Sequence, residues 1–129
     1  MLDSKYPFKN KHILVVDDEP LLREAIIFDI KKRGGIVFEA ENGTQALQVV
    51  KNNPIDMVIS DIRMPNGDGI ELLVNIRHFH ETKPLVLLVT GYADFSEAEA
   101  LRKGAYALMD KPIDRKKMLE LITTALNPT

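Results

Sequence analysis

The sequence predicts an α/β protein of five strand–helix units, a (βα)5 arrangement around one doubly wound parallel sheet. Two observations predict this fold class. Short, apolar and often β-branched segments alternate with helix-length segments, and the apolar residues of the longer segments recur about every 3.6 positions. Near-continuous apolar strands that alternate with helices are typical of a parallel sheet with both faces covered.

The strands are expected where four or five apolar residues follow one another. The five predicted strands are Ile13–Val16, Ile36–Ala40, Met57–Ser60, Leu85–Val89 and Ala105–Met109. The helices between them carry apolar stripes, such as Leu22, Ile26 and Ile30 in the first. Glycine and proline mark the boundaries: Gly34-Gly35 ends the first helix, and Pro54 follows the second. The fourth helix, within residues 94–104, is the least apolar, so we expect it to be the most exposed.

Length and composition indicate one domain of a soluble globular protein. The chain has 129 residues, of which 45% are hydrophobic and 28% charged, with a net charge of −2 and no cysteine. Disulfides and thiolate metal sites are therefore excluded, and nothing suggests a general surface for nucleic acid. The longest apolar runs, such as LVLLV, are far too short to span a membrane, so we expect a cytoplasmic protein. We expect residues 1–11 to be a loose lead-in, 12–126 to be the domain, and 127–129 to be a tail or the start of a linker.

Polar residues follow four of the five predicted strands directly. Asp17-Asp18-Glu19 comes after the first strand, Asp61 after the third, Thr90-Gly91 after the fourth, and Asp110-Lys111 after the fifth. In an open α/β sheet the ligand crevice lies outside these carboxyl ends. Each group alone has an ordinary explanation as a turn residue or a helix cap. Three carboxylates gathered at one crevice repel each other, however, and a structural role predicts no such gathering.

A hard divalent cation resolves that repulsion. Mg²⁺ takes oxygen ligands and typically uses one or two carboxylates together with phosphate oxygens. Lys111 and Thr90 then suit an oxyanion, as a positive charge and a hydrogen-bond donor. This set is typical of phosphoryl transfer, and a carboxylate that acts as the nucleophile gives an aspartyl phosphate.

Four segments together resemble the response-regulator receiver domain of two-component signalling. They are VVDDEP at 15–20, DIRMPNGDGIELL at 61–73, VTGYAD at 89–94 and KGAYALMDKPI at 103–113. The resemblance covers about residues 12–126. It implies a flavodoxin-like fold, with a five-stranded sheet in the order 2-1-3-4-5.

The resemblance also implies a role for each matching residue of the metal and phosphoacceptor site. Asp61 matches the phosphoacceptor, which takes its phosphoryl group from a sensor histidine kinase, a phosphotransfer protein or a small acyl phosphate. Asp18 matches a direct Mg²⁺ ligand, and Asp17 an acid that binds the metal mainly through water. Asp61 and the backbone carbonyl of Arg63 match the remaining protein ligands.

The residues of the implied switch follow the fourth and fifth strands. Thr90 matches the switch hydroxyl, Lys111 the contact to a phosphoryl oxygen, and Pro112 a residue whose preceding peptide bond is cis. The family usually has Tyr or Phe where this chain has Leu108, so the aromatic half of the switch is in doubt. The family reads the switch on the face formed by the fourth helix, the fifth strand and the fifth helix. Arg63 and Tyr92 match positions that flank the route of the hydrolytic water, which suggests slow autodephosphorylation.

Two other functions remain open from the sequence. A receiver fold can act as an interaction module without phosphorylation, although such modules usually lose the acidic or lysine positions that are present here. A phosphohydrolase of the haloacid dehalogenase type also uses an Asp nucleophile, Mg²⁺ and a lysine, but its nucleophile follows the first strand. We expect a phosphoacceptor rather than a turnover enzyme. It would be a monomer or weak dimer that does not itself bind nucleic acid or membrane, with an output domain or a downstream protein as its further partner.

Overall fold

The computed structural model describes residues 5–91 and 95–128 and contains five strands and five helices in strict alternation. The strands are β1 His12–Val16, β2 Ile36–Ala40, β3 Met57–Asp61, β4 Leu85–Thr90 and β5 Ala107–Asp110. The helices are α1 Pro20–Lys32, α2 Gly43–Asn52, α3 Gly69–Phe79, α4 Glu97–Arg102 and α5 Arg115–Leu126. The predicted fold class is confirmed.

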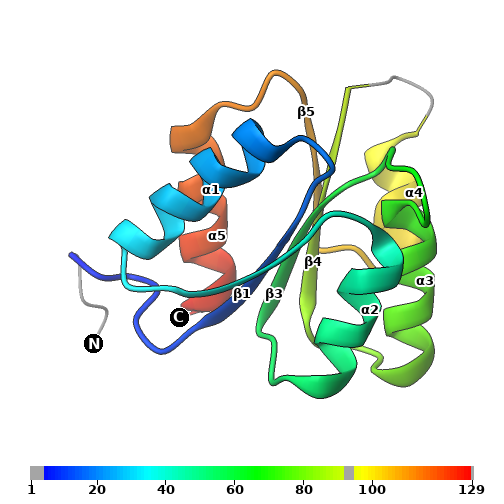
Figure 1. Cartoon of the computed structure of the whole chain (residues 1–129), viewed down its shortest axis with the longest axis horizontal. Helices are drawn as coiled ribbons and strands as arrows, with labels where there is room; N and C mark the ends of the chain where they lie inside the picture. The colour runs from blue at the N-terminus through cyan, green and yellow to red at the C-terminus, as the bar shows by residue number, and fades with distance from the viewer. Residues whose placement is uncertain (1–4, 92–94, 129) are drawn as a thin grey trace.

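All neighbouring strands are parallel, and their order is β2-β1-β3-β4-β5. Helices α1 and α5 cover one face of the sheet, and α2, α3 and α4 cover the other (Figure 1). The strand order reverses at β1, with β2 on one side and β3 on the other, so a crevice is expected outside the ends of β1 and β3. The polar groups noted in the sequence therefore meet at one edge, which we call the carboxyl rim.

Alternate residues of the central strands enter two separate cores. Ile13, Val15 and Ile59 pack on the α1–α5 side, whereas Leu14 and Val58 pack on the opposite side. This alternation follows from the two-residue period of a strand. All five residues of β3 are buried, so its last residue, Asp61, is held in a fully packed strand.

Five predicted strand ends and one helix differ from the structure; β1 begins one residue earlier than expected, at His12, and β5 ends one residue later, at Asp110. β3 and β4 each run one residue further than expected and include Asp61 and Thr90, because Asp61 is paired with Val89 in the β3–β4 register. β5 begins later, at Ala107, because residues 103–106 close helix α4, where Gly104 has a φ of 103°. Helix α4 is only six residues long, and Ala100 is its one buried residue.

The expectation of a loose lead-in at residues 1–11 is wrong for its described part around Phe8. The Phe8 side chain is fully buried in the core on the α1–α5 side, and its backbone N–H donates to the carbonyl of Arg33 at 3.0 Å. Burial of one aromatic ring is enough to hold this segment on the domain, since such rings bury a large apolar area. Among the described residues, no helix is long and apolar enough to cross a membrane.

Candidate functional site

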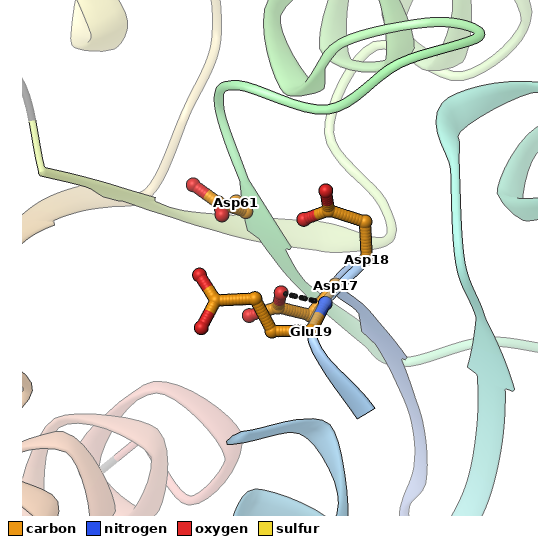
Figure 2. A group of neighbouring side chains, drawn as sticks. All are labelled: Asp17, Asp18, Glu19 and Asp61. Carbon is orange, nitrogen blue, oxygen red and sulfur yellow. Dashed lines mark hydrogen bonds between the residues drawn. The ribbon is translucent and has the colours of Figure 1, made fainter. Parts of the chain in front are cut away.

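Four carboxylates gather at the carboxyl rim. Asp17, Asp18 and Glu19 follow β1, and Asp61 ends β3, so two adjacent parallel strands deliver them to one place (Figure 2). One oxygen from each of the four lies within 4.8 Å of the others. Asp17 and Asp61 are buried, at 4% and 6% exposed, whereas Asp18 and Glu19 are exposed. The structure thus brings together the acids that the sequence singled out.

These acids do not serve as a side-chain cap for helix α1. The helix begins at Pro20, and its N-cap residue is Glu19, whose side chain makes no capping hydrogen bond. The carboxylate of Asp17 instead accepts from the backbone N–H of Glu19 at 2.8 Å, and the N–H of Asp17 donates to the carbonyl of Ala40 at 3.1 Å. The Asp17 carboxylate therefore stabilises the loop after β1. The acids of this loop are not explained by side-chain capping of α1.

The backbone on the far side of Asp61 is equally constrained. The N–H of Gly69, the first residue of α3, donates to the carbonyl of Ile62 at 2.8 Å. A Cβ atom at Gly69 would overlap the carbonyl oxygen of Asp61, so only glycine permits this close approach. Asp68, the N-cap residue of α3, accepts from the N–H of Glu71 at 2.8 Å and fixes the start of the helix. The turn after Asp61 thus fixes the backbone from which the Asp61 carboxylate extends.

Lys111 brings a positive charge to the rim from the end of β5. Its Nζ donates to Oδ2 of Asp61 at 2.9 Å and lies 3.5 Å from Oε1 of Glu19. Its backbone N–H donates to the carbonyl of Thr90 at 2.8 Å, and the Lys111–Pro112 peptide bond is cis. Burial disfavours the ammonium charge, but the hydrogen bond to Asp61 and the charges of Asp61, Asp17 and Glu19 outweigh it and raise the pKa of Lys111. Lys111 is therefore held in its charged form.

The pKa of Asp17 is raised as well, because its carboxylate is buried beside other acids. Burial is the largest cause, and the charges of Asp61 and Glu19 add to it, whereas the hydrogen bond from Glu19 and the charge of Lys111 act against it. A bound cation would remove this penalty. Carboxylate oxygens at this spacing fit Mg²⁺, which prefers oxygen ligands.

The other expected site residues lie around the same cleft or close to it. A cleft of about 400 Å³ is lined by Arg63, Gly91, Lys111 and three of the four acids. Thr90 is buried at the end of β4, beside β5. A Cβ atom at Gly91 would come no closer than 3.7 Å to Lys111, so the cleft has room at this point. Tyr92 lies outside the described residues.

Leu108 does not line the cleft. It is half-buried in β5 and packs against the core on the α2–α4 side, as does Phe95 from the segment before α4. Tyr106, which precedes β5, is 38% exposed. The position at which the resemblance implies an aromatic ring is thus occupied by Leu108, and Tyr106 lies two residues before it.

Sequence reasoning missed two residues that contact the rim. Glu19 was part of the DDE segment but was given no role, although its carboxylate lies 3.5 Å from Lys111. Arg23 was passed over entirely, although its guanidinium donates to the carbonyl of Asp17. A basic residue one helical turn after an acidic loop was the available signal.

Comparison with known proteins identifies the family. The family described as the response regulator receiver domain matches residues 13–123. The chain is 39% identical over 115 residues to the regulatory protein AtoC of Escherichia coli, which covers 88% of this chain and 25% of AtoC. It is 33% identical over 114 residues to the response regulator protein PilR of Pseudomonas aeruginosa, covering 88% of this chain and 25% of PilR. The chain spans about a quarter of the length of these curated relatives.

A solved structure agrees with both the fold and the family. The CheX–CheY–BeF3–Mg complex from Borrelia burgdorferi contains a chain that is 28% identical and superposes with a TM-score of 0.88, covering 96% of this chain and 99% of that one. Three observations agree on the family: it matches most of the chain, the sheet has the order β2-β1-β3-β4-β5, and four acids gather at the carboxyl rim. The chain belongs to the receiver-domain family of two-component response regulators.

Proposed function

We propose that Asp61 is the phosphoacceptor of this receiver domain, which spans residues 12–126 and the segment around Phe8 that packs in its core. The observation that carries the proposal is the hydrogen bond of 2.9 Å between Lys111 Nζ and Asp61 Oδ2, inside a cleft that also contains Asp18 and Glu19. The carboxylate that ends the central strand β3 is thus held by a lysine from β5 and faces a carboxylate cluster from β1. Positioning and charge stabilisation are what phosphoryl transfer requires.

In the proposed reaction a carboxylate oxygen of Asp61 attacks the phosphorus of a phosphohistidine on a kinase or phosphotransfer protein. The new P–O bond forms as the P–N bond breaks, and the electron pair of the P–N bond returns to the donor imidazole. Asp17, Asp18, Asp61 and the carbonyl of Arg63 would hold Mg²⁺, which supplies charge neutralisation for the transferred group. Lys111 keeps its positive charge and contacts a phosphoryl oxygen, because its raised pKa keeps it protonated at neutral pH.

The change of state would follow from the added negative charge. Thr90 lies buried one residue before the cleft-lining Gly91, and the carbonyl of Thr90 is bonded to the N–H of Lys111, so both residues can respond to a phosphoryl group together. The response is read on the face of α4, β5 and α5, where α4 is short and buries only Ala100. Leu108 takes the place of the usual aromatic residue, so the shift would depend on Thr90 and α4.

The partners follow from the same proposal. The chain would take its phosphoryl group from a sensor histidine kinase or a phosphotransfer protein and pass the signal to an output domain or a downstream protein. The similarity to PilR and AtoC, each about four times as long as the matched region, supports an output domain. The chain would be a monomer or a weak dimer; the NtrC4 receiver domain, solved as a beryllofluoride-activated dimer, is 26% identical with a TM-score of 0.81 and supports the dimer.

Labelling with a small acyl phosphate tests the acceptor. The chain is incubated with acetyl phosphate with and without Mg²⁺, and intact-mass spectrometry counts the phosphoryl groups. One group per chain is expected, only with Mg²⁺, and Asp61→Asn should abolish it. Labelling that persists in Asp61→Asn would refute the assignment. Continued release of phosphate far beyond one per chain would favour a phosphohydrolase, and no labelling of the wild type would favour a phosphorylation-independent module.

The rate of phosphoryl loss is a separate part of the proposal. Arg63 is exposed and lines the cleft, which supports a role in shielding the phosphoryl group from water. The labelled wild type should therefore lose phosphate more slowly than the Arg63→Ala/Tyr92→Ala double variant, measured by mass spectrometry over time. Equal rates would contradict the shielding role.

A further inference from the structure

Arg23, in the first turns of α1, connects three elements behind the carboxyl rim. Its guanidinium donates through Nη1 to the backbone carbonyl of Asp17, which follows β1. It also donates through Nε to Oε1 of Glu39 in the edge strand β2 at 3.1 Å. Only 15% of the Arg23 side chain is exposed, whereas 60% of the Glu39 side chain is exposed. The two hydrogen bonds therefore fix the guanidinium from two sides.

The carbonyl that Arg23 holds belongs to the peptide bond between Asp17 and Asp18. Because a peptide unit is planar, fixing its carbonyl oxygen also fixes the direction of the N–H and the Cα atom of Asp18. The other end of this short loop is fixed by the bond from the N–H of Glu19 to the Asp17 carboxylate. Asp18 is exposed, so the backbone contacts on either side of it help to decide where its carboxylate lies.

The charge at the rim makes such a restraint necessary. Oxygens of Asp17, Asp18, Glu19 and Asp61 lie within 4.8 Å of one another, and like charges this close repel strongly. Lys111 contacts the carboxylates of Asp61 and Glu19 through its Nζ. Arg23 contacts the Asp17–Asp18 peptide bond through the backbone carbonyl, which leaves the carboxylates available to a ligand.

We propose that Arg23 is a positioning residue for the Asp17–Asp18 acid pair, with Glu39 orienting its guanidinium, and that the two together set the affinity of the rim for Mg²⁺. This inference rests on the proposed function, in which these acids hold Mg²⁺. Guanidinium geometry is essential to the role, because a planar fork reaches the carbonyl and the Glu39 carboxylate at once, whereas the ammonium of lysine is a point charge.

The sign of the effect separates positioning from simple electrostatics. A positive charge near the site repels a cation, so if Arg23 acted only through its charge, its neutralisation would tighten Mg²⁺ binding. If Arg23 acts by positioning, its loss weakens binding despite the removed repulsion. Residues that orient metal ligands typically change metal affinity by about 10- to 100-fold when they are replaced.

Isothermal titration of the full chain with MgCl2 tests the proposal, and the melting temperature in EDTA reports the fold of each variant. We expect Arg23→Gln and Arg23→Lys to raise the Kd for Mg²⁺ about tenfold. Glu39→Gln, which changes an exposed side chain, should raise the Kd by a smaller factor. Lys31→Gln, an exposed cation of the same helix, is the control for the loss of one charge and should leave the Kd unchanged.

Each outcome decides a different point. If the wild type binds Mg²⁺ saturably and Arg23→Gln binds it equally well or more tightly, the positioning role is overturned. The proposed metal site would then stand. No saturable binding by the wild type would overturn the proposed metal site and this role with it. If the Arg23 variants fail to fold, Glu39→Gln carries the test, and a Kd equal to that of the wild type would overturn the inference. Asp18→Asn should abolish binding and confirms that the titration reports on the rim.

Discussion

Two regions of the molecule hold carboxylates away from bulk water, and they treat the charge in opposite ways. Asp29 of α1 is 9% exposed, and its two oxygens accept from Nε and Nη2 of Arg115 on α5 at 2.6 and 2.7 Å. Arg115 lowers the pKa of Asp29, chiefly through these hydrogen bonds and against the effect of burial. At the carboxyl rim, four carboxylates gather, Lys111 contacts two of them, Asp61 and Glu19, and the pKa of Asp17 is raised.

The difference separates a structural carboxylate from one that requires a ligand. The Asp29–Arg115 pair joins α1 to α5 and is complete without any added ion. The cleft beside this pair measures about 780 Å³, nearly twice the cleft at the rim, and its lining includes Arg33, Lys116 and Glu120 besides the paired Asp29 and Arg115. The gathering of four carboxylates therefore identifies the candidate site, and the size of the cleft does not.

The largest effect should come from the backbone that holds the rim. In Gly69→Ala the new methyl group would overlap the Asp61 carbonyl, which cannot rotate away as a side chain could. We expect a loss of about 3 kcal/mol in the free energy of unfolding, from overpacking, measured by urea denaturation in EDTA. Gly91→Ala is the matched control, since its Cβ atom would meet only ordinary contacts with Lys111. Equal losses in the two variants would show that the rim backbone is not specially constrained.

The next effect should come from the balanced pair. Arg115→Ala leaves the Asp29 carboxylate, whose side chain is 12% exposed, without two donors. A buried acceptor that loses its partner costs about 1–3 kcal/mol, and solvent around the pair should keep the loss near the lower end of that range. Urea denaturation measures the loss, and Lys116→Ala, at an exposed neighbouring residue, is the control. A loss no larger than that of the control would mean that the pair does not join the two helices.

The comparison also shows how far the sequence could predict this molecule. The sheet and the rim acids could be predicted because each rests on a local pattern: apolar runs mark strands, and parallel strands deliver their last residues to one edge. Asp29 resisted prediction because its partner lies 86 residues away on another helix, and nothing in either segment indicates the pairing. Neither the Lys83–Pro84 cis peptide bond nor the burial of Phe8 has a local signal of this kind.

Residues that support the site were harder to predict than the residues of the site. Asp61 and Lys111 carry chemistry that is recognisable from residue type and position at a strand end. Arg23 and Glu39 meet only because α1 packs over the ends of β1 and β2, which depends on strand register and helix placement. The ends of β3 and β4 were predicted to within one residue. Their exact positions depend on which residues of the two strands pair, and pairing between distant segments cannot be read from a local pattern.

A smaller effect, of opposite sign, should appear when one rim charge is removed. Asp17 has a raised pKa in the folded state, so its ionisation opposes folding, and the metal-free protein should gain stability as pH falls from that folded value toward about 3.9, the unfolded value. Asp17→Asn removes this penalty and should raise the melting temperature in EDTA at pH 7, by less than Arg115→Ala lowers it. Stability gained from Mg²⁺ should shrink in the same variant. A lower melting temperature in EDTA would contradict the view that the rim holds excess charge.

The smallest effect concerns the pH dependence of the balanced pair. Asp29 has a lowered pKa in the folded state, so its contribution to stability is present above about pH 3.9, the unfolded value, and is lost as pH falls through the folded value. The melting temperature of Asp29→Asn should therefore lie below that of the wild type at pH 6, and the gap should narrow between pH 4 and pH 2.5. Glu120→Gln, at an exposed acid beside the same cleft, is the control and should show no such narrowing. A gap for Asp29→Asn that stays constant would mean that packing holds the carboxylate, because its interactions with Arg115, Arg33 and Lys32 depend on its ionisation.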